Sequence, residues 1–412
     1  MLPRPPPRVA PPALATAAGG GEPAAGHGDP RHDHHRPAGL ARPRRRRCAG
    51  NRPPPTRQPA RHAGHEPSRE PVAMSATVPA APAYEGAWVG EVVPALLGMG
   101  DAGVLPGPAR EASQAVVLVV DGLGWDAVQG GGPPELAALG GGPVDTTVPA
   151  TTATALTSIT TGRPPAEHGI IGYRMRVGGQ VVSTLSWNPD KGPDPERVQP
   201  HPPFAGRTVP AVTHADFLGS GLTTAHLRGA DLVGWKTPSM LVQHALAAVT
   251  SGAPVVYAYY DGLDKVGHEF GPRSPFAARE LAWVDRLVGE LRDALPGGCA
   301  LVVTVAAWAG DGRLRSLYAA PGQSGRLLEA CGEAYSDVAW VLTRQQVVDA
   351  GWLGATPSPE VAGRLGDVVL ASRGEATFIT PDLRREANLR GAHGSLTPAE
   401  LRVPLLAGRG RG

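Results

Sequence analysis

Three apolar runs, the third with one threonine inside it, mark the chain between residues 115 and 306. They are AVVLVV from Ala115, PVVYAYY at 254–260 and ALVVTVA at 300–306, and the first two end on acidic residues and glycines. Short runs rich in β-branched residues and bounded by turns are typical of strands buried on both faces of a parallel sheet. We therefore predict three buried strands, with an acidic turn after each of the first two.

Two helices are predicted between these strands. The small-residue stretch from Thr152 is expected to be helical as far as Gly162, where the glycine and the following Arg163–Pro164 end the helix. Residues 276–295 have helical periodicity, so one face of this second helix is expected to be buried. That face consists of Phe276, Leu281, Val284, Leu287, Val288 and Leu291.

The remaining segments complete an α/β pattern. Residues 180–212 look irregular and are expected to form a surface excursion over the site, and residues 313–405 alternate short strands with helices. Strands separated by helices indicate a parallel or mixed sheet covered on both faces. Sites in such sheets lie at the carboxyl ends of strands, so the residues that follow the apolar runs are the first candidates for chemistry.

Residues 1–73 differ in composition from the remainder. They are rich in proline, contain 13 Arg, no Lys and five acidic residues, and show no apolar periodicity. Such a segment cannot bury enough apolar surface to offset its ordering entropy, so we predict a disordered tail at 1–73 and one folded domain at 74–412. The tail has no apolar core of a secretory signal. Met74 opens an ordinary N-terminal sequence, so read-through from a misassigned start is an alternative origin for the tail.

The tail also distorts the overall charge. The whole chain has 39 basic and 37 acidic residues, which leaves 26 basic and 32 acidic residues beyond residue 73. The folded part is thus mildly acidic, and we expect it not to bind nucleic acid. No apolar run has the length of a membrane span, and three cysteines without CxxC spacing support neither disulfides nor a cysteine zinc site. We expect a cytoplasmic protein without a membrane partner; its oligomeric state is open.

Metal-binding or nucleophilic side chains stand at the ends of several predicted elements. Asp121 follows the first strand, Thr152 begins a helix, Asp264 and His268 follow the second strand, and His393 lies in GAHGSL. The i, i+4 spacing of Asp264 and His268 places both on one face of a helical turn, where they could hold one cation. Taken singly, Asp121 and Thr152 could be helix caps, and His393 could be an ordinary loop residue.

Together these segments resemble the alkaline phosphatase superfamily, and most closely its type I phosphodiesterase / nucleotide pyrophosphatase branch. The resemblance covers roughly residues 85–407. VVDGLG resembles the first metal-binding Asp turn of that family, and PATT followed by TGRPPAEHGIIGY resembles its nucleophile motif. LDKVGHEFGP resembles its D-x-x-G-H-x-x-G-P element, and GAHGSLTPAELRVPLL resembles its C-terminal metal-binding His and the next strand. The last two motifs are the more specific.

The resemblance implies an alkaline-phosphatase-like three-layer α/β/α sandwich with a central, mostly parallel sheet. It also implies two Zn²⁺ ions. One would be held by Asp264, His268 and His393. The other would be held by Asp121, the Thr152 oxygen and an Asp–His dipeptide.

Thr152 is the nucleophile that the resemblance implies. It is preferred over Thr151 because it lies three residues after Pro149 and ten before Gly162, which is where the family places its nucleophile. A threonine hydroxyl is a poor nucleophile until a cation lowers its pKa, and the helix that starts here favours an anionic phosphate. The intermediate would be a phosphoryl- or nucleotidyl-threonine.

The chain departs from the family pattern at the second ion. Ala306 and Ala307 stand where the Asp–His dipeptide is expected, and Trp308 replaces the following glycine. We infer a deletion here, with Asp311 as a less favoured substitute ligand, and therefore expect one zinc ion where the intact pattern has two. Tyr173 stands where related phosphodiesterases place an Asn that contacts the phosphoryl oxygens.

The sequence thus predicts a metal-dependent phosphodiester or nucleotide pyrophosphate hydrolase that acts through Thr152 on a small phosphate ester or nucleotide. Its activity is expected to be impaired because the second ion lacks ligands. The alternative is a non-catalytic binding or scaffold protein of the same fold. A relative acting on sulfate esters or transferring phosphoryl groups within phosphosugars is less favoured, and no C/S-x-P-x-R context of a sulfatase surrounds Thr152.

Overall fold

The computed structural model describes residues 77–412 except 131, 307–310 and 381–385. The tail predicted at 1–73, and Ala307 and Trp308 of the expected ligand turn, lie outside the described residues. Within the described part, no helix combines the length and the apolar character needed to cross a lipid bilayer.

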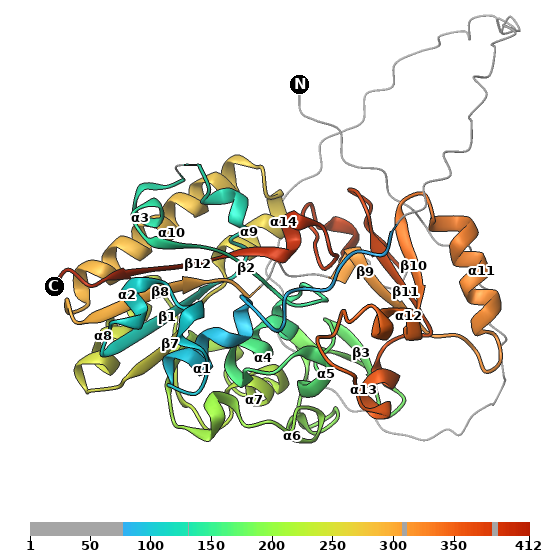
Figure 1. Ribbon diagram of the computed structural model, residues 1–412, viewed down its shortest axis with the longest axis horizontal. Coiled ribbons are helices and arrows are strands. Elements are labelled where there is room, and N and C mark those ends of the chain that lie inside the picture. Colours follow the sequence, from blue (N-terminus) through green and yellow to red (C-terminus); the bar gives the residue numbers. More distant parts are fainter. Residues whose placement is uncertain (1–76, 131, 307–310, 381–385) are drawn as a thin grey trace, which may run out of the picture. The chain divides into compact units, whose positions relative to one another are not determined.

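The largest sheet among the described residues has seven strands and lies at the left in Figure 1. In spatial order its strands are β2 (Gly140–Asp145), β12 (Arg402–Arg409), β8 (Cys299–Thr304), β1 (Gln114–Val120), β7 (Val255–Tyr260), β5 (Pro210–His214) and β6 (Asp231–Trp235). The strands from β8 to β6 pair in parallel, whereas β12 is antiparallel to both of its neighbours. All residues of β7 and β8 are buried, as the two later apolar runs predicted.

Helices cover both faces of this sheet, and alternation along β7 identifies the two layers. The Tyr260 hydroxyl donates to Glu280 of α10 (Pro275–Ala294), so this face carries α10 and the helix that contacts it, α8 (Pro238–Thr250). Tyr257 points to the opposite face, where its ring packs against Phe204 in a turn that contacts α4 (Thr152–Thr161). The α/β architecture with a central, largely parallel sheet is thus confirmed.

The predicted amphipathic helix at 276–295 forms as α10, but one residue of its expected buried face is wrong. Four residues of that face are fully buried, namely Val284, Leu287, Val288 and Leu291, and Leu281 is half-buried. Phe276 is 57% exposed. Its ring stacks on Phe270, with centroids 4.1 Å apart, because the first turn of α10 packs beside α9 (Gly262–Phe270).

The segment from residue 313 alternates strands and helices, as predicted. It builds a second, antiparallel sheet of β10 (Ala339–Thr343), β11 (Val368–Ser372) and β9 (Leu314–Leu317), in that spatial order. The segment 180–212 is more regular than predicted, since β4 (Gln180–Ser183) pairs with β3 (Arg174–Val177) and is followed by α6 (Pro195–Val198). Its many prolines hid these short elements from the sequence pattern.

Shorter helices complete the described chain. Their bounds are α1 (Val92–Leu96), α2 (Gly107–Arg110), α3 (Pro134–Ala137), α5 (Pro165–His168), α7 (Gly221–Leu227), α11 (Ser324–Tyr335), α12 (Arg344–Asp349), α13 (Pro359–Arg364) and α14 (Pro398–Leu401). Cys299 and Cys331 are buried free thiols, and a buried free cysteine behaves as a small apolar residue.

Candidate active site

The carboxyl ends of β1 and β7 lie side by side, and both predicted acidic turns start there. The backbone N–H of Asp121 donates to the carbonyl oxygen of Tyr260 at 2.8 Å. Gly122 follows with φ of +85°, and a Cβ at this position would lie 2.7 Å from the Cα of Asp264. Only glycine permits this approach, which brings the Asp121 turn against α9.

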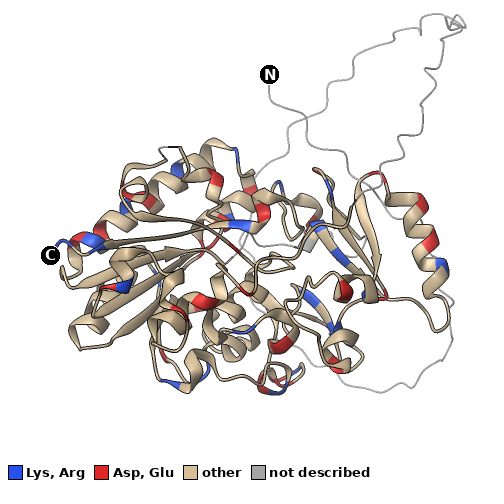
Figure 2. Ribbon diagram, in the orientation of Figure 1, with Lys and Arg blue, Asp and Glu red and all other residues tan. Residues whose placement is uncertain are grey.

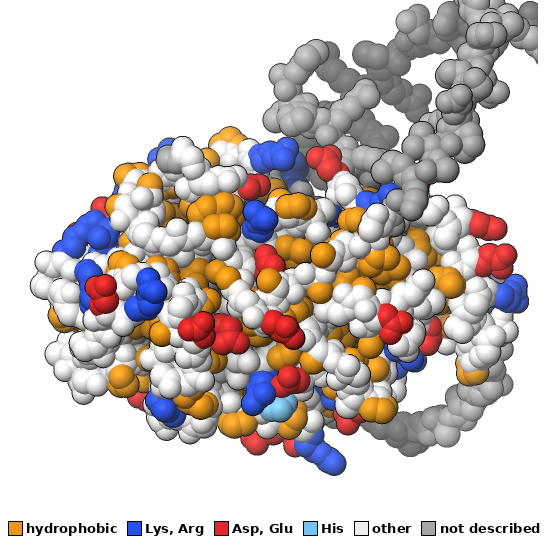
Figure 3. Space-filling model, viewed as in Figure 1, with side chains coloured by type: hydrophobic (Ala, Val, Ile, Leu, Met, Phe, Trp, Pro, Cys, Tyr) orange, Lys and Arg blue, Asp and Glu red, His pale blue; other side chains and the backbone are white. Residues whose placement is uncertain are grey.

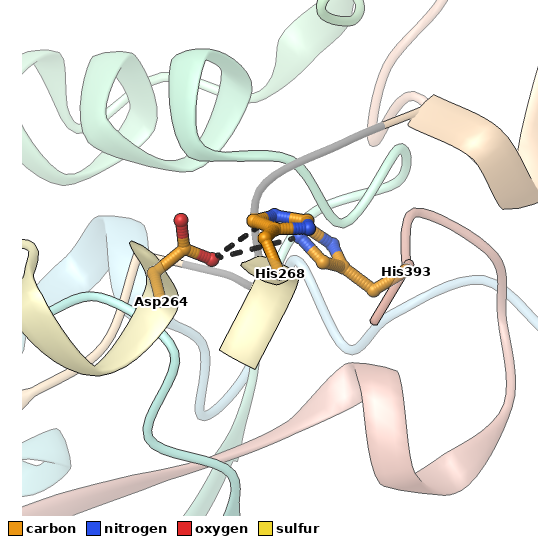
Figure 4. A group of neighbouring side chains, drawn as sticks. All are labelled: Asp264, His268 and His393. Carbon is orange, nitrogen blue, oxygen red and sulfur yellow. Dashed lines mark ion pairs between the residues drawn. The ribbon is translucent and has the colours of Figure 1, made fainter. Parts of the chain in front are cut away.

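Three side chains next to this turn form a group that could hold a metal ion. Asp264 and His268 lie one helical turn apart on α9, as their i, i+4 spacing predicts, and His393 comes from the loop before α14 (Figure 4). Their ligand atoms all lie within 4.8 Å of one another. The Oδ1 atom of Asp264 is 3.4 Å from Nε2 of His268 and 4.0 Å from Nε2 of His393. Tertiary structure therefore brings together the three residues expected to hold one ion.

Backbone carbonyl groups orient both imidazole rings. The Nδ1 atom of His268 lies 2.8 Å from the carbonyl oxygen of Gly391, and the Nδ1 atom of His393 lies 2.6 Å from that of Ala150. Because a carbonyl oxygen only accepts hydrogen bonds, each Nδ1 carries the ring proton, and each Nε2 presents its lone pair toward Asp264. A second hydrogen bond of this kind fixes the ring in most metal-binding histidines.

The electrostatics of the group also suit a cation. Burial raises the pKa of Asp264 well above its usual range, and the carboxylates of Asp121 and Asp261 raise it further. Burial lowers the pKa of both His268 and His393, so both rings are neutral at physiological pH. Neutral imidazoles are the form that binds metal, and a divalent cation would offset the repulsion among the carboxylates. These residues therefore fit one divalent ion.

Thr152 lies beside Asp121 at the start of α4. Its Oγ1 donates to Oδ2 of Asp121 at 2.9 Å, and the residue is 4% exposed. Thr151 is the N-cap residue but makes no capping hydrogen bond with its side chain; its Oγ1 lies 3.0 Å from that of Thr154. The structure thus joins Thr152, rather than Thr151, to the first acidic turn, and neither hydroxyl caps the helix.

One residue of the site was missed by the sequence analysis. Tyr259, in β7, donates its hydroxyl hydrogen to the same Oδ2 atom of Asp121 at 2.6 Å. Burial, followed by the negative charge of Asp121, raises the pKa of Tyr259 well above its ordinary value, so it remains a phenol and a donor. The sequence could have indicated Tyr259, because its polar hydroxyl stands at the carboxyl end of an otherwise apolar strand, and sites in parallel sheets form at this end.

Among the described residues, few of the ligands expected for a second ion lie around Asp121. Ala306 is buried and has no ligand atom in its side chain, and its carbonyl oxygen accepts a hydrogen bond from Thr146 Oγ1 at 2.7 Å. Ala307 is outside the described residues, as is the side chain of Asp311. Among the ligands expected for the second ion, the described part of the chain supplies Asp121 and the Thr152 oxygen, fewer than the three or four protein ligands of zinc sites.

Tyr173 lies immediately before β3 and is half-buried. Its carbonyl oxygen accepts the backbone N–H of Thr184 at 2.8 Å, which fixes the backbone at the start of the β3–β4 hairpin. A contact between its hydroxyl and a phosphoryl oxygen stays a prediction.

Residues 115–307 match the family model described as type I phosphodiesterase / nucleotide pyrophosphatase. The match contains Asp121, Thr152, Asp264 and His268, and it stops at the place where the Asp–His dipeptide is expected. His393 lies beyond it. A comparison with curated proteins gave no significant match.

Several solved structures share the fold. Murine ectonucleotide pyrophosphatase / phosphodiesterase 5 superposes with a TM-score of 0.54 at 14% identity, over 71% of this chain and 87% of that chain. The human protein of the same name gives a TM-score of 0.54 at 15% identity, over 71% and 87% of the two chains. Phosphonoacetate hydrolase from Sinorhizobium meliloti 1021, in complex with phosphonoformate, gives 0.51 at 20% identity, over 73% and 91%. Residues 115–307 thus match the type I phosphodiesterase / nucleotide pyrophosphatase family model, and the chain shares its fold with these solved structures.

Proposed function

We propose that this protein is a metal-dependent hydrolase of phosphodiesters or nucleotide pyrophosphates, with Thr152 as its nucleophile. The observation that carries the proposal is the hydrogen bond from Thr152 Oγ1 to Asp121, beside the buried group formed by Asp264, His268 and His393. The family match over residues 115–307 supports the reaction class. One solved relative, an inactive variant of the murine protein, is in complex with AMP, which supports a nucleotide as substrate.

The residues suggest a division of roles. The N-terminus of α4 presents backbone N–H groups and a positive dipole end to the phosphate. As Thr152 Oγ1 forms a bond to phosphorus, Asp121 accepts the hydroxyl proton across the existing hydrogen bond. The bond from phosphorus to the leaving oxygen breaks, and water later hydrolyses the phosphoryl- or nucleotidyl-threonine. A bound cation supplies positive charge for the developing charge on the phosphoryl oxygens.

We propose a single Zn²⁺ ion, held by Asp264, His268 and His393. Two nitrogen ligands and one carboxylate oxygen form a common zinc ligand set and leave one coordination position open. Because two-ion enzymes use a second cation to stabilise the attacking or leaving oxygen, a single-ion site is expected to be slower than the intact family pattern. Activity is therefore proposed to be impaired rather than absent.

A small substrate also agrees with the surface. Acidic and basic side chains are interspersed over the described elements (Figure 2), and the face seen in Figure 3 mixes both signs with scattered apolar side chains. A nucleic-acid surface would instead gather basic residues on one face or along one groove. That the folded part does not bind nucleic acid, and that the protein is cytoplasmic, remain predictions.

Substitution of the two neighbouring threonines tests the proposal. With zinc added and bis-p-nitrophenyl phosphate as substrate, Thr152→Ala should lower kcat/KM by about 100-fold or more, because it removes the nucleophile. Thr151→Ala is the matched control and should remain near the parent, since its hydroxyl lies 3.0 Å from the hydroxyl of Thr154 and, among the described residues, makes no hydrogen bond to Asp121. A Thr152→Ala protein as active as the parent would refute the assignment. A parent that binds AMP in calorimetry without any hydrolysis would favour the non-catalytic alternative.

A further inference from the structure

Two hydroxyl groups converge on one carboxylate oxygen of the candidate site. Oδ2 of Asp121 accepts from Thr152 Oγ1 at 2.9 Å and from the Tyr259 hydroxyl at 2.6 Å. The three residues come from different elements, since Asp121 follows β1, Thr152 begins α4 and Tyr259 lies in β7. The family resemblance assigns no role to this tyrosine.

The hydroxyl of Tyr259 has a fixed position. The side chain is almost fully buried, and its ring lies against that of Phe217, with centroids 6.2 Å apart. The indole N–H of Trp235 donates to the carbonyl oxygen of Tyr259 at 3.0 Å. Val119 of β1 pairs with Tyr259 in the parallel ladder, so sheet register places the phenol over the turn at Asp121. Backbone pairing and ring packing therefore both aim the donor at this carboxylate.

A donor at this position stabilises the charge of Asp121. Asp121 lies close enough to Asp264 for the two carboxylates to repel, and the cation that would separate their charges at the second site lacks ligands among the described residues. A charge-assisted hydrogen bond stabilises a carboxylate and restricts its rotation. The phenol thus supplies part of what a second cation would supply to Asp121, namely charge stabilisation and a fixed orientation.

We propose that Tyr259 is a positioning residue, which holds Asp121 in the orientation that receives the Thr152 hydroxyl in a one-cation site. With Oδ2 held in place, the Thr152 hydrogen points to Asp121, and the Oγ1 lone pairs point away from it. Tyr259 acts through Asp121 and has no contact with the reacting phosphorus in this scheme. The inference rests on the proposed function.

The experiment compares two adjacent tyrosines of β7. Tyr259→Phe removes the donor and keeps the packed ring, so kcat for bis-p-nitrophenyl phosphate should fall by about 10- to 100-fold, the effect of losing one hydrogen bond to a charged group. KM and the zinc content per chain should remain at the parental values, because the metal group and the helix terminus are untouched. Tyr260→Phe is the control, since its hydroxyl donates to Glu280 on the opposite face of the sheet, and it should keep the parental kcat.

Two further measurements separate positioning from a loss of structure. 4-Aminophenylalanine at position 259 restores a donor on the same ring and should recover most of the lost kcat. In an Asp121→Asn background, Tyr259→Phe should lower kcat by a much smaller factor than it does in the parent, because a positioning residue acts through its partner. The role is overturned if kcat survives in Tyr259→Phe, if the donor fails to restore it, or if the loss is equally large in the Asp121→Asn background.

Failure of the proposed function would look different. A parent that does not hydrolyse the diester contradicts that function, and orthovanadate then serves as the probe because it imitates the five-coordinate phosphorus at Thr152. Tyr259→Phe should weaken orthovanadate binding by about 10-fold or more, whereas Tyr260→Phe should not change it. Equal orthovanadate affinity in the parent and Tyr259→Phe, or no binding by the parent, would overturn the positioning role.

Discussion

The Nδ1 atom of His393 lies 2.6 Å from the carbonyl oxygen of Ala150, two residues before Thr152. This contact joins positions 243 residues apart in the sequence. It ties the C-terminal member of the candidate metal-binding group to the turn that leads into α4, the helix that begins at Thr152. We therefore expect metal affinity and the placement of Thr152 to be coupled through the backbone.

The parent chain should bind one zinc ion, and His393→Ala should lower its affinity by more than about 100-fold, since loss of a ligand exceeds the effect of losing an outer-shell partner. A competition titration against a chelating dye measures both the stoichiometry and the affinity. His244→Ala, on α8 and outside the group, is the matched control. Two tightly bound ions in the parent would contradict the one-ion site.

Gly122→Ala should destabilise the fold by about 2–5 kcal/mol, because it adds overpacking to the cost of a positive φ. The new Cβ would lie 2.7 Å from the backbone of Asp264, so zinc affinity should fall as well. Gly219→Ala is the control, because Gly219 also has a positive φ of +77° but nothing lies within 4 Å of the added Cβ. This substitution should lower the free energy of unfolding by about 1 kcal/mol. Urea unfolding followed by tryptophan fluorescence compares the two. Equal losses would show that the approach of Gly122 to α9 is not tight.

The stability of the chain should decline below pH 6.5. Burial lowers the pKa of His226 to about 4 in the folded state, against an ordinary value of 6.5. Between these two values the unfolded chain binds more protons, so the free energy of unfolding falls as pH falls, by about 1.4 kcal/mol per pH unit for this one group. Its Nδ1 atom lies 2.6 Å from the Leu222 carbonyl oxygen, within α7.

His226→Gln should remove this share of the pH dependence. Urea unfolding between pH 4.5 and 8, in EDTA to exclude metal, should give parallel curves for parent and variant above pH 6.5 and a shallower slope for the variant below it. His168 should behave in the same direction, because burial lowers its pKa to about 3. Identical slopes for parent and His226→Gln would contradict a buried neutral histidine.

Arg313→Met should lower the free energy of unfolding by about 3–5 kcal/mol, because it leaves the Glu400 carboxylate buried without its arginine partner. Arg313 Nε and Nη2 donate to this carboxylate at 2.7 and 3.1 Å. Glu400 also accepts the backbone N–H of Ser395, two residues after His393, so zinc affinity should drop together with stability.

The exposed pair of Arg163 and Glu167 provides the comparison for this effect. Arg163→Met should change the free energy of unfolding by less than about 1 kcal/mol, since surface ion pairs contribute little. The double variant Arg313→Met/Glu400→Met should be closer to the parent than Arg313→Met alone, because it leaves no unpaired charge. If the single variant is as stable as the double variant, the ion pair does not organise the His393 loop.

The sequence by itself determined the α/β class and the approximate limits of the principal strands and helices. An apolar run such as that of β1 is typical of a strand buried on both faces, and the repeat in α10 matches the geometry of one helix. Asp264 and His268 could be paired in advance because their spacing depends on local helix geometry alone. Where burial depended on neighbours, as for Phe276, the pattern was misleading.

Only the tertiary structure decided how distant segments complete the site. His393 reaches the group through its bond to Ala150, and the Gly122 turn meets α9 through the pairing of β1 with β7. The bond from Tyr259 to Asp121 depends on that same register, which no local periodicity encodes. Local spacing determines which side chains share a helix face or a strand face. Long-range backbone pairing determines which of these faces lie against one another, and the chemistry proposed for Thr152 depends on those long-range contacts.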